Sequence, residues 1–162
     1  MKEYKNIVPE IIVGLGDKTE FAEKEPPFKT VTKLHTRLED WLGDDLMLNS
    51  NCCIVTEALK KALEKTELTG FEFAEMRVTK DEYFDDNYQL NKPLPKFYWM
   101  KITGTQNVDD LFLDSIDDLY ASNIFLSFLK NGFQINHLNI DPKYDKETDD
   151  FIMSLIKRDK GL

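Results

Sequence analysis

The chain has 162 residues, of which 41% are hydrophobic and 12% aromatic, and its formal net charge is −9. This size and apolar content predict one folded domain spanning 1–162, because a disordered chain lacks the apolar surface that offsets chain entropy. The negative charge repels nucleic acid and anionic lipid, so we expect no nucleic acid and no membrane as partners. No run approaches the roughly 18 apolar residues of a membrane span. Charged residues also interrupt the N-terminal segment where a signal peptide is apolar, so we expect a cytoplasmic protein.

The N-terminal part is expected to form a strand, a loop and a helix. β-Branched residues between Ile7 and Val13 predict a strand, and Pro9 restricts it to a sheet edge or places the proline at the strand start. The polar stretch 17–28 contains two adjacent prolines and is typical of a loop. Helical spacing of apolar residues then predicts a helix over 31–42, from Val31, Leu34, Leu38, Trp41 and Leu42.

The only two cysteines, Cys52 and Cys53, are adjacent in an apolar run that predicts a strand. Neighbouring side chains of a strand point to opposite faces, so the pair cannot easily share a metal ion or form an unstrained disulfide. A zinc site would need four ligands, and only His35 and His137 are left to complete it. We interpret both cysteines as small core residues in a reducing compartment, and we expect no metal and no cofactor.

Two segments, 52–78 and 118–140, share one pattern and predict an internal repeat of a strand-helix-strand unit. In each, an apolar strand ends at a residue suited to cap a helix, Thr56 in the first and Ser122 in the second. A helix with an apolar face follows, and then a Gly-Phe pair opens the next strand. Chance similarity between two amphipathic segments is the alternative.

A shared irregularity favours the repeat over chance. The apolar alternation changes phase at Ala74-Glu75 in the first copy and at Asn136-His137 in the second. A period of two changes phase only where a residue is inserted, so we predict a bulge or bend at both places.

Further elements are expected between and after the copies. Residues 81–92 are interpreted as a long loop, and 94–104 as a central strand. The alternation of this strand predicts one buried face and one partly solvated face. The buried face is Tyr98, Met100 and Ile102, and the other is Phe97, Trp99, Lys101 and Thr103. Acids before basic residues predict a C-terminal helix over 147–158.

No common catalytic motif occurs in the sequence, which contains no phosphate-binding glycine loop, nucleophile elbow or HExxH. Neither His35 nor His137 has a nucleophile and an orienting acid at a catalytic spacing, so an enzyme would need the fold to bring one beside a carboxylate in a cleft. The Asp-Asp pairs at 44, 85, 109, 117 and 149 lack the alternating acids of a calcium loop. We therefore expect no enzymatic activity.

Acidic residues concentrate in 81–120, where nine acids and three lysines give −6 of the net −9. Charge of one sign speeds encounter with an oppositely charged partner and selects it. Tyr83 and Phe84 lie in the expected loop, where aromatic side chains suit a contact surface. A solvated surface, and packing of these aromatic rings onto the body, are the alternatives. The candidate partner-binding residues are Asp85, Asp86, Asp109, Asp110, Asp114, Asp117, Asp118, Tyr83 and Phe84.

The stretch TEALKKALEKTELTGFEFAEMRV at 56–78, the segment LPKFYWMKITG, Asp109-Asp110 and the later GFQI resemble immunity proteins of bacterial polymorphic toxin systems. The resemblance covers roughly residues 40–140 and consists mostly of core positions. It implies a small, acidic, cytoplasmic protein that is made beside a toxin gene, binds the toxin domain and blocks it. Because the contact surfaces of such proteins vary with the toxin, no residue role carries over.

Together these features predict an α+β domain with a mixed sheet and two repeated strand-helix-strand units. The expected function is that of a non-enzymatic immunity protein whose acidic segment binds a cognate toxin with a basic surface, such as a nuclease. The alternative is a small-molecule or regulatory binding domain in which Tyr83, Phe84 and Tyr88 close over a pocket.

Overall fold

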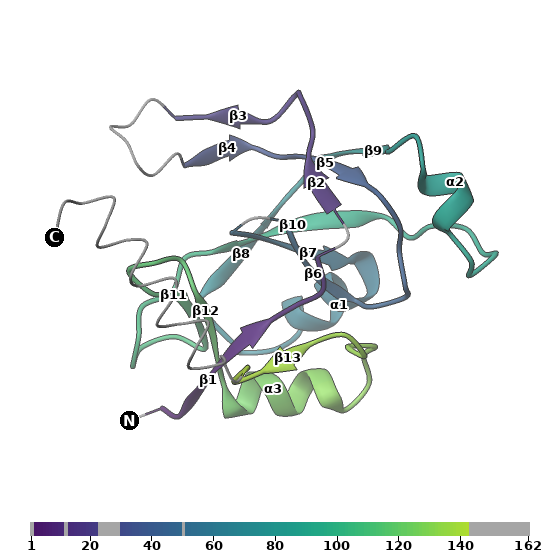
Figure 1. The fold of residues 1–162 in the computed structure, drawn as a ribbon. Helices are drawn as coiled ribbons and strands as arrows, with labels where there is room; N and C mark the ends of the chain where they lie inside the picture. The colour runs from purple at the N-terminus through teal and green to yellow at the C-terminus, as the bar shows by residue number, and fades with distance from the viewer. Residues whose placement is uncertain (1, 12, 23–29, 50, 143–162) are drawn as a thin grey trace, which may run out of the picture.

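The computed structural model describes residues 2–11, 13–22, 30–49 and 51–142, which form 13 strands and three helices (Figure 1). The predicted α+β class is confirmed. The helices are α1 (Glu57–Glu64), α2 (Phe84–Asn87) and α3 (Asn123–Lys130). The strands are β1 (Tyr4–Val8), β2 (Val13–Leu15), β3 (Glu20–Phe21), β4 (Val31–Lys33), β5 (His35–Leu38), β6 (Leu46–Asn49), β7 (Cys52–Thr56), β8 (Phe71–Ala74), β9 (Arg77–Lys80), β10 (Phe97–Ile102), β11 (Leu111–Leu113), β12 (Leu119–Ser122) and β13 (Asn139–Ile140). No helix among the described residues is long and apolar enough to cross a membrane.

The strands of the described residues form two antiparallel sheets of four strands and two smaller sheets. The central sheet has the order β6-β7-β10-β8, and the second large sheet has the order β11-β12-β1-β13. The side sheet β2-β5-β9 is mixed, because β5 pairs antiparallel with β2 and parallel with β9. The hairpin β3-β4 extends from the side sheet (Figure 1).

The central sheet separates two hydrophobic cores. On one face, Cys53 and Val55 pack with the buried sides of α1 and α3, and on the other, Cys52 and Ile54 pack with the side sheet. The cysteines are therefore free, buried and on opposite faces, as predicted. Phe97 and Trp99 belong to the second core, so the partly solvated face predicted for this strand is wrong there. The side sheet covers that face, which the local pattern does not reveal.

The predicted helix over 31–42 is also wrong, because this segment forms β4 and β5. Its apolar spacing satisfies a helical period, but Thr36 is fully buried and pairs with Val78 of β9 and Leu15 of β2. His35, Thr36 and Leu38 are all buried, so β5 lacks the regular alternation of buried and exposed residues that distinguishes a strand from a helix in sequence. The predicted helix over 147–158 lies outside the described residues.

The two helix starts agree with the predicted caps. Thr56 Oγ1 accepts a hydrogen bond from the backbone N–H of Leu59 at 3.4 Å, and Ser122 Oγ accepts one from Phe125 at 3.1 Å. Each cap hydroxyl in turn donates a hydrogen bond to an aspartate. Thr56 donates to Asp45, which directly precedes β6, at 2.6 Å, and Ser122 donates to Asp110, which directly precedes β11, at 2.7 Å. Both helices thus begin at the same arrangement of aspartate and hydroxyl.

The two large sheets have the same topology. In the central sheet, the antiparallel pair β6-β7 leads into α1 and then into the edge strand β8. In the other sheet, the pair β11-β12 leads into α3 and then into the edge strand β13. In both sheets one further strand lies between the pair and the edge strand. This inserted strand is β10 in the central sheet, whereas the N-terminal β1 supplies it in the other. The shared topology is what a repeat would produce, and the boundaries 52–78 and 118–140 stay a prediction.

The predicted phase changes fall where regular strand structure is interrupted. β8 ends at Ala74 in the central sheet, and β9 begins at Arg77 in the side sheet, so the phase changes where the chain passes between sheets. In the second copy the only strand after α3 is Asn139–Ile140, so the longer strand predicted there is wrong. The backbone N–H groups of Asn136 and His137 instead donate to Asp44.

Candidate functional site

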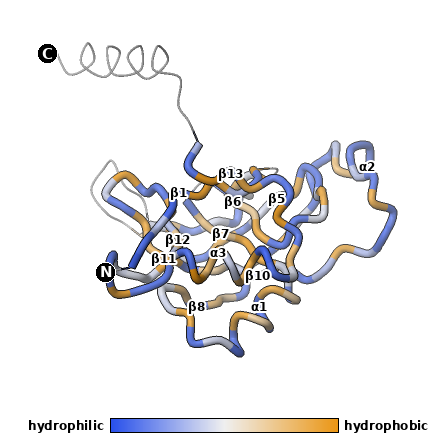
Figure 2. Tube along the Cα trace, turned by 90° about the horizontal axis from the view of Figure 1, so that it is seen from below, coloured by the Kyte–Doolittle hydropathy of each residue, from blue (hydrophilic) through white to orange (hydrophobic). Residues whose placement is uncertain are grey.

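The predicted partner-binding residues do not form one cluster. Asp85 and Asp86 lie on α2, whereas Asp114, Asp117 and Asp118 belong to the turn between β11 and β12. These two elements lie at opposite ends of the molecule in both views, and the chain around α2 is largely hydrophilic (Figures 1 and 2). A single partner contact of ordinary size would therefore use one of the two regions.

The aromatic residues of the α2 region are divided between core and solvent. Phe84 is buried and its ring stacks on Tyr88 with centroids 5.1 Å apart, so the expectation that Phe84 is a contact residue is wrong. Tyr83 is 60% exposed and remains available together with Asp85 and Asp86. We call these three residues the α2 surface.

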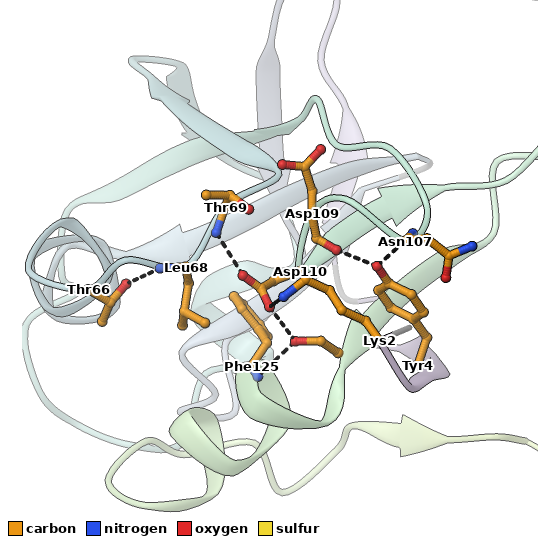
Figure 3. A network of polar contacts seen from close by, with 10 residues as sticks. Lys2, Tyr4, Thr66, Leu68, Thr69, Asn107, Asp109, Asp110 and Phe125 are labelled. Atoms are coloured by element: carbon orange, nitrogen blue, oxygen red, sulfur yellow. Dashed lines mark hydrogen bonds and ion pairs between the residues drawn. The ribbon is translucent and has the colours of Figure 1, made fainter.

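Asp109 and Asp110 support the fold. Asp110 accepts hydrogen bonds from Ser122 Oγ at 2.7 Å and from the backbone N–H of Thr69 at 3.0 Å, and its carboxylate lies 3.3 Å from Lys2 Nζ (Figure 3). Asp109 accepts from the backbone N–H of Thr105 at 2.7 Å. Asp110 is buried, so its assignment as a contact residue is wrong.

Electrostatics agree with a structural role for Asp110. Burial by itself would raise the pKa of this carboxyl, but the bonds from Ser122, Thr69 and Lys2 outweigh burial and hold the pKa below its ordinary value. The native fold therefore stabilises the carboxylate form.

The β11–β12 turn presents acids around one apolar side chain. Asp114 Oδ1 accepts the backbone N–H groups of Ile116 at 3.0 Å and Asp118 at 2.9 Å, which closes the turn. Asp117 has a positive φ of 64°, a conformation that aspartate tolerates better than most residues. Ile116, at the tip, is 70% exposed. We call Asp114, Ile116, Asp117 and Asp118 the hairpin surface.

Within the described part of the chain, no Lys or Arg forms an ion pair with the three aspartates of the hairpin surface. Burial, together with the charges of Asp114 and Asp117, raises the pKa of Asp118. Asp117 Oδ2 accepts a hydrogen bond from a neutral donor, Asn51 Nδ2, at 3.3 Å. The turn therefore has a local negative potential. Sequence reasoning found its acids but missed Ile116, whose signal was a lone apolar residue between acids.

A cavity of about 500 Å³ adjoins the hairpin surface. Asp117 and Ser115 line it from the turn, and Trp99 and Lys101 line it from β10. Lys101 Nζ lies 4.7 Å from the centroid of the Trp99 ring. Its lining combines polar side chains with apolar ones, as sites for small ligands do.

The two histidines have different surroundings. His35 is buried, and both ring nitrogens are engaged, Nδ1 by the backbone N–H of Lys18 at 3.1 Å and Nε2 by Thr79 Oγ1 at 2.7 Å. His137 is partly exposed, and its Nδ1 lies beside the carboxylates of Glu10 and Asp44. These contacts indicate a packing role for His35, whereas the more exposed His137 forms a hydrogen bond through Nδ1 with Asp44 Oδ1 at 3.3 Å.

Comparison with models of protein families, with curated proteins and with solved structures finds no match to this chain.

Proposed function

We propose that the protein is a non-enzymatic immunity protein that binds a cognate bacterial toxin domain in the cytoplasm and blocks it. The observation that carries this proposal is the hairpin surface, where exposed Ile116 lies among aspartates that form no ion pair with a described Lys or Arg. The family resemblance of residues 40–140 supports the same function. The proposal assigns no catalytic residue.

The chemistry of the hairpin surface specifies the partner. An exposed apolar side chain suits a shallow hydrophobic hollow on the toxin, where it would be desolvated on binding. Asp117 and Asp118 suit lysines and arginines around that hollow, as found on a nuclease surface. Asp114 is needed to close the turn, so its contribution to the partner is indirect.

Matched charge variants test the surface. Asp117→Asn with Asp118→Asn removes two negative charges from the hairpin surface, and Asp85→Asn with Asp86→Asn removes two from the α2 surface. Asparagine keeps the size of the side chain and tolerates the positive φ of residue 117. Each variant is co-expressed in a bacterial host with the toxin encoded by the neighbouring gene, and association rates are measured with purified proteins.

We expect the hairpin pair to lower the association rate roughly tenfold at low salt, an effect that fades as salt screens the charges. Ile116→Ser should raise the dissociation constant by about tenfold or more, because it removes a central apolar contact. The α2 pair should change neither. Cells that die equally fast with and without the protein would refute the immunity function. Protection that depends on the α2 pair would refute only the surface.

The cavity beside Trp99 favours a second candidate function, the binding of a small polar molecule. Its volume of about 500 Å³ lies within the range of ligand sites. A thermal-shift screen of nucleotides, amino acids and sugars tests this function, with Lys101→Ala as the variant that should abolish a hit. Because Lys101 is outside the hairpin surface, the same variant should still protect cells from the toxin if the immunity proposal is correct.

A further inference from the structure

Three distant segments bring Glu10, Asp44 and His137 together. Glu10 follows β1, and its backbone carbonyl accepts a hydrogen bond from the N–H of Leu48 in β6 at 2.9 Å. Asp44 and His137 each lie two residues before a strand, β6 and β13 respectively. The fold therefore gathers two carboxylates and an imidazole from positions that are up to 127 residues apart in sequence, since 137 − 10 = 127.

The distances suit a shared cation. His137 Nδ1 lies 3.5 Å from Glu10 Oε2 and 3.3 Å from Asp44 Oδ1, and one ligand atom from each residue lies within 4.8 Å of the others. Ligand atoms bound at the usual zinc distances are about 3.4 Å apart in a tetrahedral site. Both separations from His137 agree with that spacing, and the ligand atoms of the two carboxylates lie within 4.8 Å of each other, so the side chains would close around an ion.

Glu10 supplies an independent indication of a ligand. Its side chain is only 8% exposed, and its buried Oε2 has no hydrogen-bond partner among the described residues. A buried carboxylate oxygen without a donor carries an uncompensated desolvation cost. A cation at this place would satisfy the oxygen and offset the gathered negative charge.

Asp44 is held in place for such a role. Its side chain is 1% exposed, and its oxygens accept the backbone N–H groups of Asn136 at 3.1 Å and His137 at 2.9 Å. The indole N–H of Trp41 donates to its backbone carbonyl at 2.9 Å. Hydrogen bonds around a ligating carboxylate fix its orientation, as in established metal sites.

We propose that Glu10, Asp44 and His137 bind a divalent transition-metal ion, with Zn²⁺ as the best match. An imidazole with two carboxylates favours Zn²⁺ over Ca²⁺ or Mg²⁺, which prefer oxygen ligands alone. His137 is 43% exposed, so solvent reaches the site and water completes the coordination. The ion connects the segment after β1 with those that lead into β6 and β13. This site does not depend on the proposed immunity function.

The test uses the full chain after treatment with a chelator. Zn²⁺, Mn²⁺ and Ca²⁺ are titrated by isothermal calorimetry, and the melting temperature is measured with and without each ion. His137→Ala removes a partly exposed ligand and should leave the fold intact, and Glu10→Gln keeps the shape of the buried side chain. Asp17→Asn is the control, because Asp17 Oδ1 is paired at 3.5 Å with the other histidine, His35.

We expect one Zn²⁺ per chain, weaker Mn²⁺ binding and no saturable Ca²⁺ binding. At about a hundredfold excess of free Zn²⁺ over its dissociation constant, the melting temperature should rise by roughly 5–10 °C. Both effects should persist in Asp17→Asn and disappear in His137→Ala and Glu10→Gln, whose near-ultraviolet circular dichroism without metal should match the parent. Absence of saturable Zn²⁺ binding, equal binding by either ligand variant, or Ca²⁺ binding as tight as Zn²⁺ would overturn the proposal.

Discussion

Replacing Asp110 with alanine should destabilise the protein without touching a partner contact. The substitution removes the acceptor for Ser122 Oγ and for the backbone N–H of Thr69, and it breaks the contact with Lys2. Hydrogen bonds to a charged group are worth about 1.5–3 kcal/mol each, whereas the partly exposed Lys2 contact adds little. Because water can reach part of the vacated space, we expect a total loss of about 3 kcal/mol.

Urea unfolding followed by circular dichroism measures this loss directly. The midpoint should fall while the slope of the free energy of unfolding against urea stays constant, since the surface exposed on unfolding is unchanged. For a chain of 162 residues, a loss of this size lowers the melting temperature by roughly 6–12 °C. Asp85→Ala on α2 is the control, and as an exposed substitution it should change stability by less than about 0.5 kcal/mol.

A loss below about 1 kcal/mol, or one equal to that of Asp85→Ala, would refute the structural role of Asp110. The distinction matters for the proposed function, because a variant that reverses Asp110 to lysine would lose binding through unfolding. Contact is therefore tested at the hairpin surface, where substitution of Asp117 leaves the core unchanged.

Three further predictions concern packing and titration. A Cβ at Gly104 would overlap the backbone of β11, so Gly104→Ala should cost roughly 3 kcal/mol in urea unfolding, whereas Gly132→Ala, with open space around it, should cost almost nothing. Burial lowers the pKa of His35 below its ordinary 6.5, so the folded state keeps the imidazole neutral; stability should be constant above pH 6.5 and decline as pH falls below it, and this part of the decline should vanish in His35→Gln. Burial raises the pKa of the Cys52 thiol to about 11 and that of Cys53 still further, so neither should react with Ellman's reagent at pH 8 until the chain is unfolded in urea. A midpoint in Gly104→Ala equal to the parent, an identical pH dependence in the His35 variant, or rapid thiol labelling of the folded protein would each contradict the corresponding account.

Features that depend on a few neighbouring residues could be predicted from the sequence. The caps at Thr56 and Ser122 are such features, because a cap hydroxyl accepts a hydrogen bond from a backbone N–H three residues ahead. The opposite orientation of Cys52 and Cys53 follows in the same way from the geometry of a strand. The α+β class follows from the sum of such local patterns.

Only the tertiary structure determined which of those local elements cover one another. Residues 31–42 satisfy a helical spacing, yet they form strands because β2 and β9 bond to β5 along both edges. The two acidic pairs Asp109-Asp110 and Asp117-Asp118 look alike in sequence, but a neighbouring loop buries Asp110 and solvent surrounds Asp117. Burial and electrostatic environment depend on segments far away along the chain, which is why the same residue type becomes a structural anchor at one position and a candidate contact at the other.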